Sequence, residues 1–142
     1  MNINISLTGT SEIQLSNNYQ IVPGCYTILN LDKDKWVSIT TYCPIVTVSG
    51  GSSIGSISIK INDTIQSSSF WYTSDIPGFL SIGNGSIINT IILLKKGVNI
   101  ISLQARQWNS LPNVNTVVNH NTNDIVGSNN ELSLKSSLTI KE

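Results

Sequence analysis

The sequence contains few of the residues that build helices. Its 142 residues include one Ala, one Met, one Arg and three Glu, all of which favour helix interiors. The β-branched residues are abundant instead, with 22 Ile, 12 Thr and 9 Val, and these side chains pack well on the pleated surface of a sheet. We therefore predict an all-β protein, and the length favours a single domain that covers residues 1–142.

Charged residues are also scarce, and their scarcity argues against nucleic-acid binding. They make up 11% of the chain, with eight basic and eight acidic residues, and the only adjacent basic pair is Lys95-Lys96. A protein that grips a nucleic-acid backbone clusters Lys and Arg to displace counterions. A polar but uncharged surface has little electrostatic repulsion against self-association, so we expect a protein that works in an assembly.

Long apolar runs are absent, which argues against membrane insertion. The most apolar stretch, residues 87–94, is interrupted by Asn89 and Thr90, whereas a spanning helix needs roughly 20 apolar residues. The first residues, Met1 to Ser6, alternate polar and apolar side chains and have neither the basic nor the apolar region of a signal peptide. We expect a soluble chain.

The two cysteines, Cys25 and Cys43, do not predict a metal site. They lie eighteen positions apart, without a CxxC motif and without a neighbouring cluster of His or acidic residues, so zinc would lack ligands. The spacing is compatible both with a disulfide between neighbouring strands and with two buried free thiols. Of these we favour the thiols, and we expect neither a metal nor a cofactor.

The single histidine, His120, does not make the chain an enzyme by itself. Asp124 follows four residues later, but no nucleophile motif such as GxSxG accompanies the pair. We therefore expect no catalytic residues and interpret His120 as a solvated histidine in an Asn-rich loop. A small hydrolase that uses His120 and Asp124 is a third and weaker hypothesis.

Alternation of polar and apolar residues predicts short strands along most of the chain. It is clearest where Ile57, Ile59 and Ile61 share one face, opposite a wetted side. The segments with this pattern are residues 2–8, 13–15, 26–31, 36–41, 45–49, 56–62, 70–72, 86–94, 98–104, 131–134 and 137–141. About eight to ten strands without a helical period predict a two-sheet antiparallel β-sandwich or jelly roll.

The connections between these strands are predicted from turn residues. Pro23-Gly24 is a turn signal, and the charged run Asp32-Lys33-Asp34-Lys35 indicates a hairpin tip. Residues 86–94 and 98–104 are predicted to form a β-hairpin around Gly97.

Two polar segments separate the remaining predicted strands. Residues 62–69 are polar, and no strand is predicted there. Residues 109–130 hold eight asparagines and one proline. We predict that the second segment is a long loop with one edge strand inside it.

The aromatic residues are a better clue to function than the titratable ones. Trp71, Tyr72 and Trp108 stand among Ser, Asn and Gln, and sugar-binding surfaces combine flat rings with short polar side chains. The competing interpretation is that Trp36, Trp71 and Trp108 are anchors of the core or of a subunit interface. We favour the anchors, and the three sugar-stacking residues remain the alternative.

Residues 90–104 resemble a known hairpin. The run TIILLKKGVNIISLQ is similar to the strand, Lys-Gly turn and strand ending in Leu-Gln near the end of trimeric jelly rolls of the tumour-necrosis-factor and C1q type, and to segments of viral and phage fibre heads or knobs. In such domains a variable loop and a final strand follow, which matches residues 109–130 and 132–140. The resemblance covers about the last third of the chain.

The resemblance implies a non-enzymatic homotrimer that acts as a structural or receptor-binding domain of a virus or phage particle. Its partners would be copies of itself, another virion protein or a cell-surface glycan, and its location the virion or an extracellular surface. The alternative function is a monomeric carbohydrate-binding β-sandwich module that stacks sugars on Trp71, Tyr72 and Trp108.

Overall fold

The regular secondary structure of the described residues consists of strands. The computed structural model describes residues 2–48, 52–73, 81–83, 87–108, 116–120 and 134–142, and among them it has twelve strands and no helix. The all-β prediction is confirmed, and no helix in these ranges could cross a membrane. The strand count exceeds the expected eight to ten because four of the strands are only two or three residues long.

The strands form three antiparallel sheets, two large and one small. The first sheet has the order β1 (Asn4–Thr8), β12 (Ser137–Lys141), β4 (Lys35–Tyr42) and β9 (Ile87–Leu94). The second has the order β3 (Gln20–Leu31), β10 (Gly97–Gln107), β6 (Ser53–Ile61) and β7 (Thr64–Thr73). The third has the order β2 (Ile13–Gln14), β11 (Thr116–Val118), β5 (Ile45–Thr47) and β8 (Ser81–Ile82).

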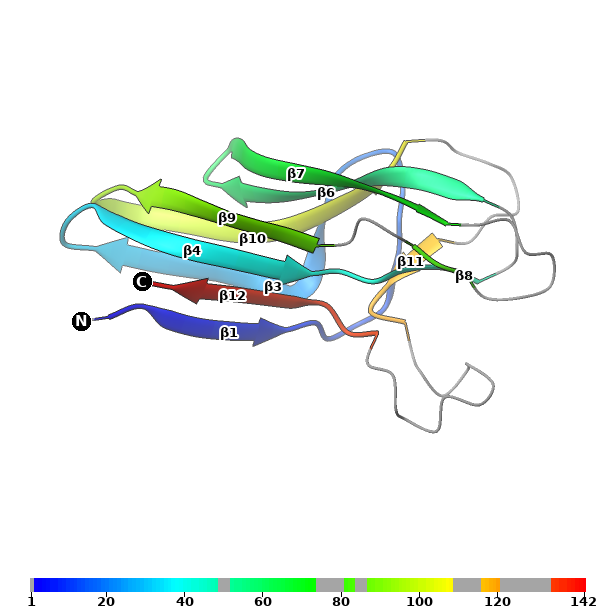
Figure 1. Ribbon diagram of the computed structural model, residues 1–142, viewed down its shortest axis with the longest axis horizontal. Coiled ribbons are helices and arrows are strands. Elements are labelled where there is room, and N and C mark those ends of the chain that lie inside the picture. Colours follow the sequence, from blue (N-terminus) through cyan, green and yellow to red (C-terminus); the bar gives the residue numbers. More distant parts are fainter. Residues whose placement is uncertain (1, 49–51, 74–80, 84–86, 109–115, 121–133) are drawn as a thin grey trace.

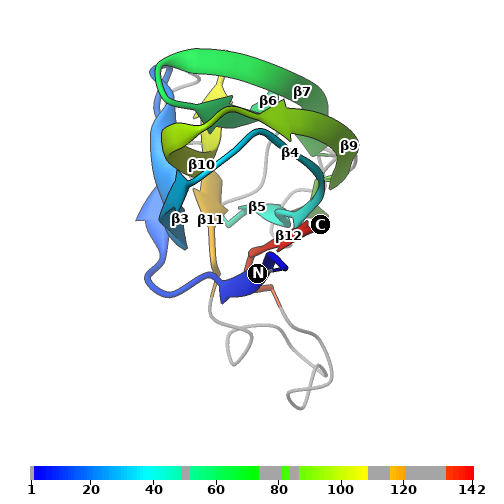
Figure 2. The ribbon, with the colours of Figure 1, turned by 90° about the vertical axis from the view of Figure 1, so that its left-hand side faces the viewer.

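The two large sheets face each other in a β-sandwich-like arrangement, and the small sheet lies at one end (Figures 1 and 2). Each large sheet turns every second residue inward, as the alternation of β4 between exposed and buried positions illustrates. The core between the sheets is filled mainly by aliphatic side chains and one indole. Its largest fully buried members are Trp71, Ile39, Ile45, Ile57, Ile59, Leu94, Ile101, Leu103, Leu134, Leu138, Ile140 and Val22.

The hairpin predicted between residues 86–94 and 98–104 is wrong. β9 pairs with β4 in the first sheet, whereas β10 pairs with β3 and β6 in the second. The Lys95-Lys96 connection therefore carries the chain across the core rather than along one sheet. Alternation marks the buried face of each strand, but it does not say whether two successive strands pair side by side or pack face to face.

The hairpin tip predicted at residues 32–35 is wrong for the same reason, because β3 and β4 belong to different sheets. The connection between β3 and β4 is hydrogen-bonded to the connection between β9 and β10. The Asp34 carboxylate accepts hydrogen bonds from the backbone nitrogen of Lys96 at 2.8 Å and from Lys95 Nζ at 3.1 Å. The two crossings thus support each other at one end of the sandwich.

Residues 62–69 do form a strand for most of their length. β7 begins at Thr64, and it pairs with β6 through a two-residue turn at Asn62 and Asp63. Asn62 has a positive φ of 52°, a conformation that Asn tolerates in tight hairpin turns, and its Oδ1 accepts a hydrogen bond from the backbone of Ile100 at 3.0 Å. The prediction failed because serine-rich strands lack an apolar signal.

Pro23-Gly24 lies within β3 and does not end it. Between Tyr26 and Ile21 the pairing with β10 shifts register, so the dipeptide sits in an irregularity of the strand. Gly24 has φ of 89°, which only glycine adopts without strain.

The strand expected within residues 109–130 is present as β11, but it is not an edge strand, because it pairs with both β2 and β5. The final strand is confirmed as β12, which lies between β1 and β4. Most of the Asn-rich segment lies outside the described residues.

Candidate functional site

The outward side of the second sheet brings together aromatic and hydroxyl side chains near the ends of β10, β6 and β7. The strand registers place these residues in three rows that cross the sheet. We call this surface the binding face, and its rows are Trp108, Ile54 and Tyr72, then Arg106, Ser56 and Phe70, then Gln104, Ser58 and Ser68.

Three rings of the binding face are open to solvent. Phe70 is 55%, Tyr72 44% and Trp108 50% exposed. Phe70 and Tyr72 alternate along β7 and therefore share a face, with ring centroids 6.4 Å apart and an interplanar angle of 19°. Trp108 lies two strands away, on the other side of Ile54. Rings thus flank the face on two sides.

A serine at the centre of the face connects these groups. Ser56 Oγ accepts hydrogen bonds from Trp108 Nε1 at 3.1 Å and, over a long 3.4 Å, from Arg106 Nε. It lies 2.8 Å from the phenolic oxygen of Tyr19. Because a hydroxyl has two acceptor sites and one proton, Ser56 donates that proton to Tyr19.

Tyr19 reaches the face from the connection between β2 and β3. Its phenolic oxygen also accepts a hydrogen bond from Ser58 at 2.7 Å, and the Arg106 guanidinium carbon lies 4.8 Å from the centre of its ring. Burial acts to raise the pKa of Tyr19, but the hydrogen bonds with Ser56 and Ser58 and the Arg106 charge outweigh it and lower the pKa below the ordinary 10.0. The network fixes Tyr19 and Arg106 in place.

Of the three residues predicted to stack on a sugar, Tyr72 and Trp108 lie on the binding face, but Trp71 does not. Trp71 is completely buried in the core, because it alternates with Phe70 and Tyr72 and so points to the inner side of the sheet. The prediction that Trp71 stacks on a sugar is therefore wrong, and Trp71 is a core anchor. Trp36 is strongly exposed on the first sheet and is not a core residue.

Sequence reasoning missed Phe70 and Arg106 of the binding face as site residues, and also Tyr19, which reaches the face from a connection. Phe70 carried a signal, since a residue two positions from Tyr72 in a strand shares its face. Tyr19 and Arg106 carried none, because their contacts with Ser56 span 37 and 50 positions of sequence. Such contacts depend on the pairing of strands.

His120 is not solvated as predicted. Its side chain is buried, and its Nδ1 lies 2.5 Å from the exposed carboxylate of Glu12. Its Nε2 is buried without a hydrogen-bond partner among the described residues. Asp124, the partner expected for a hydrolase, lies outside the described residues.

Both cysteines are free and buried, as favoured from the sequence. Burial raises the pKa of the Cys25 thiol to about 11 and that of the Cys43 thiol to about 12. Protonated thiols are poor nucleophiles and poor metal ligands. Within the described ranges no three His, Cys, Asp or Glu side chains gather in a way that could hold a metal ion.

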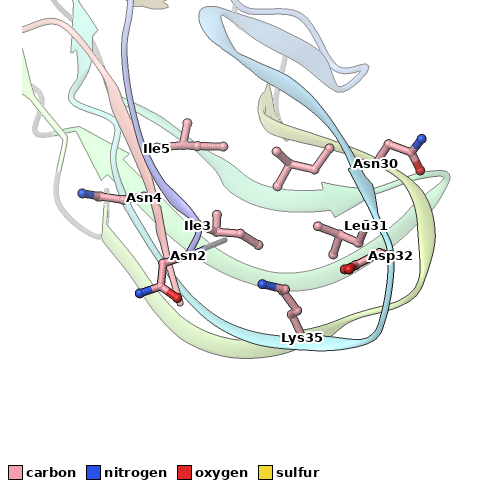
Figure 3. A pocket seen from close by; sticks show the side chains of 9 residues that line it. Asn2, Ile3, Asn4, Ile5, Asn30, Leu31, Asp32 and Lys35 are labelled. Atoms are coloured by element: carbon pink, nitrogen blue, oxygen red, sulfur yellow. The ribbon is translucent and has the colours of Figure 1, made fainter.

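A pocket of about 520 Å³ opens between β1 and the end of β3. Figure 3 shows Ile3, Ile5 and Leu31 around it, with Lys35 and Asp32 at the rim. Lys35 also pairs with Glu142 at 2.9 Å. The pocket has an aliphatic floor but no exposed ring, so its chemistry differs from that of the binding face.

The outward side of the first sheet is apolar along β4 and β9. Trp36 is 63% and Ile91 71% exposed, and Tyr42 faces Ile87 at the opposite end of the two strands. We call these residues, with Leu93, the apolar face. A polar pair, Thr40 and Asn89, lies between the two ends and is joined by a 3.3 Å hydrogen bond.

No protein-family model matches the chain, and no curated protein matches it either. The function is therefore inferred from the two surfaces.

Proposed function

We propose that the protein is a non-enzymatic receptor-binding domain that recognises carbohydrate with its binding face. This proposal rests on one observation, which is that exposed rings lie on both sides of a hydroxyl network with a fixed orientation. Phe70 and Tyr72 lie on one side of Ser56, and Trp108 lies on the other.

The chemistry of the face suits a sugar. An aromatic ring packs on the apolar face of a pyranose, and polar side chains hydrogen-bond to its hydroxyls. Ser56 and Ser58 are buried and hold their neighbours in place, so the polar groups at least partly open to a sugar are Tyr19, Arg106 and Ser68. Tyr72 and Trp108 lie two strands apart, which corresponds to about 9–10 Å between their backbones, so one sugar chain can contact both. The described side chains of the face can pack against a sugar and form hydrogen bonds with it. Among them there is no carboxylate or imidazole that could act as a general base.

The test is isothermal titration calorimetry on glycans first selected with a glycan array. Trp108→Ala, Tyr72→Ala and Phe70→Ala should each weaken binding about tenfold or more. Trp36→Phe is the matched control, because it changes an exposed indole on the other sheet and keeps that surface apolar. Failure of the folded wild-type protein to bind any glycan, or equal loss in Trp36→Phe, would contradict the proposal.

We further infer that the eight long strands form a jelly roll. Every connection between successive long strands passes from one large sheet to the other, except the β6–β7 hairpin, and such alternation is characteristic of two interleaved Greek keys. This order supports the resemblance to viral and phage head domains. We therefore propose that the protein acts on a virus or phage particle, at the virion or an extracellular surface.

The second candidate function is assembly into a homo-oligomer, a trimer by the same resemblance. It is supported by one end of the apolar face, where Trp36 and Ile91 are both more than half exposed and Trp36 lies opposite Leu93, since exposed apolar surface marks interaction sites. Analytical ultracentrifugation at micromolar concentration should give a species heavier than the 15.4 kDa chain. Ile91→Lys should dissociate it and Tyr72→Ala should not; a pure monomer would contradict assembly.

A further inference from the structure

The binding face contains the only arginine of the sequence, Arg106. It lies on β10 opposite Ser56, whose other neighbour across the sheet is Phe70. A single guanidinium in the middle of a surface otherwise built from rings and hydroxyls suggests what the ligand must supply. We propose that the sugar bound by this face carries a carboxylate and that Arg106 binds it, an inference that rests on the proposed function.

The guanidinium is held in a defined orientation. Its Nε donates to Ser56 Oγ at 3.4 Å, and its carbon lies 4.8 Å from the centre of the Tyr19 ring. Stacking on an aromatic face restrains the plane of a guanidinium. With Nε engaged by Ser56, the two terminal nitrogens can bind a planar, two-oxygen acceptor.

The charge of Arg106 is not paired within the described part of the chain. The ion pairs found there join Lys35 to Glu142, Lys95 to Asp34 and His120 to Glu12. Arg106 is partly buried, and a partly buried charge without an opposite charge is costly in free energy. A ligand carboxylate would supply the missing charge.

A carboxylate fits this position better than a phosphate ester, which carries more than one negative charge near neutral pH, and the experiment separates it from a sulfate ester. Arginine binds a carboxylate through two parallel hydrogen bonds in one plane, and the face offers one such fork. A second cation on the same side, Lys60, lies opposite Ser102, four residues from Arg106 along β10, or about 13 Å. One site of one positive charge matches a group with one negative charge.

The experiment compares two sugars that differ only in charge. Binding of trigalacturonic acid and of its methyl ester is measured by isothermal titration calorimetry, with sialyllactose against its methyl ester as a second pair and a sulfated galactose disaccharide as a third probe. The wild-type protein should bind each carboxylate form about 10- to 100-fold more tightly than its neutral partner. The preference should weaken as salt is raised.

Arg106→Gln should bind the acid and the ester equally, at the affinity that the wild type shows for the ester. Lys60→Gln removes the same charge from the same side of the sheet and should keep the preference to within about twofold. Arg106→Lys keeps the positive charge but removes the guanidinium that can form two parallel hydrogen bonds. It should therefore keep only part of the preference for the acid over the ester. It also remains informative if Arg106→Gln does not fold, which circular dichroism and thermal unfolding will show.

The failures are distinguishable. If neutral glycans bind as tightly as acidic ones, or if Arg106→Gln keeps the preference, the carboxylate inference is overturned while sugar binding stands. A preference for the sulfated sugar overturns it as well. If the folded wild-type protein binds none of the glycans, neutral or acidic, the proposed function falls and takes this inference with it.

Discussion

Gly55 lies directly opposite Trp71 on the paired strands β6 and β7, and the indole occupies the space beside it. A Cβ atom at position 55 would lie 2.5 Å from Cζ2 of Trp71 and would also collide with the backbone oxygen of Arg106. The absence of a side chain at Gly55 therefore allows the largest core side chain to lie flat beneath the binding face.

We expect Gly55→Ala to lower the free energy of unfolding by about 1–3 kcal/mol or more, because overpacking forces a rigid ring and a backbone to move. Urea denaturation followed by tryptophan fluorescence measures the change. Gly97→Ala is the comparison, since a Cβ there meets open space and only its φ of 101° opposes the substitution. A smaller effect at Gly55 than at Gly97 would contradict this packing.

Ser56→Ala should affect both stability and binding. The substitution removes the acceptor of Trp108 Nε1 and Arg106 Nε and the neighbour of the Tyr19 phenol. We expect a loss of about 1–3 kcal/mol of unfolding free energy, together with weaker glycan binding because the two side chains lose their fixed orientation. Thermal unfolding and calorimetry measure the two effects.

Ser68→Ala is the matched control for that change. Ser68 lies on the same face at the edge of the network, where it bonds to Ser58 at 2.9 Å and interacts with Tyr19 more weakly than Ser56 and Ser58 do. Its substitution should cost under about 1 kcal/mol. Equal effects of the two variants would mean that Ser56 is not the centre of the network.

The two thiols should be unreactive in the native protein. Burial raises the pKa of Cys25 to about 11 and that of Cys43 to about 12, so almost no thiolate exists at pH 8. Mass spectrometry after iodoacetamide treatment should find no adduct on the folded protein and two adducts on the protein unfolded without reductant. A disulfide would leave the unfolded protein unlabelled.

The pair of crossings at one end of the sandwich should lose its support in acid. The backbone hydrogen bond from Lys96, and then the Lys95 side chain, lower the pKa of Asp34 below its ordinary 3.8. A carboxylate whose pKa is lower in the folded state stabilises the fold above the unfolded-state pKa, and this contribution disappears as the pH falls through the folded-state pKa.

Urea denaturation of the wild-type protein and of Asp34→Asn at several pH values tests this. The wild type should be the more stable protein at pH 6, and the difference between the two should shrink as the pH drops below 3.8. Glu142, whose pKa is lowered by its hydrogen bond with Lys35, is present in both proteins and cancels. A difference that does not change with pH would contradict the role of the charge.

The strands could be predicted from the sequence wherever one side is aliphatic and the other polar. Ile57, Ile59 and Ile61 mark β6 because a slip of one residue would expose all three. The pairing of strands could not be predicted, because alternation is the same for a strand that pairs with its successor and for one that crosses the core. Residues 87–94 and 97–107 show this ambiguity.

The binding face could be predicted only in part. Tyr72 and Trp108 meet there because each neighbours Ile54, a fact of register that no local pattern contains. The wrong prediction for Trp71 could have been avoided from the sequence alone, since strict alternation puts this residue on the side opposite to Phe70 and Tyr72. Tyr19 enters through a connection without a periodic pattern.

The position of β12 between β1 and β4 has a consequence for biosynthesis. β1 is made before β12, its pairing partner among the described strands, so its edge stays unpaired until residues 137–141 have left the ribosome. Pairings of such long sequence separation slow folding and leave a nascent chain open to aggregation. Co-expression with chaperones should therefore raise the yield of folded protein more than any change at its surface.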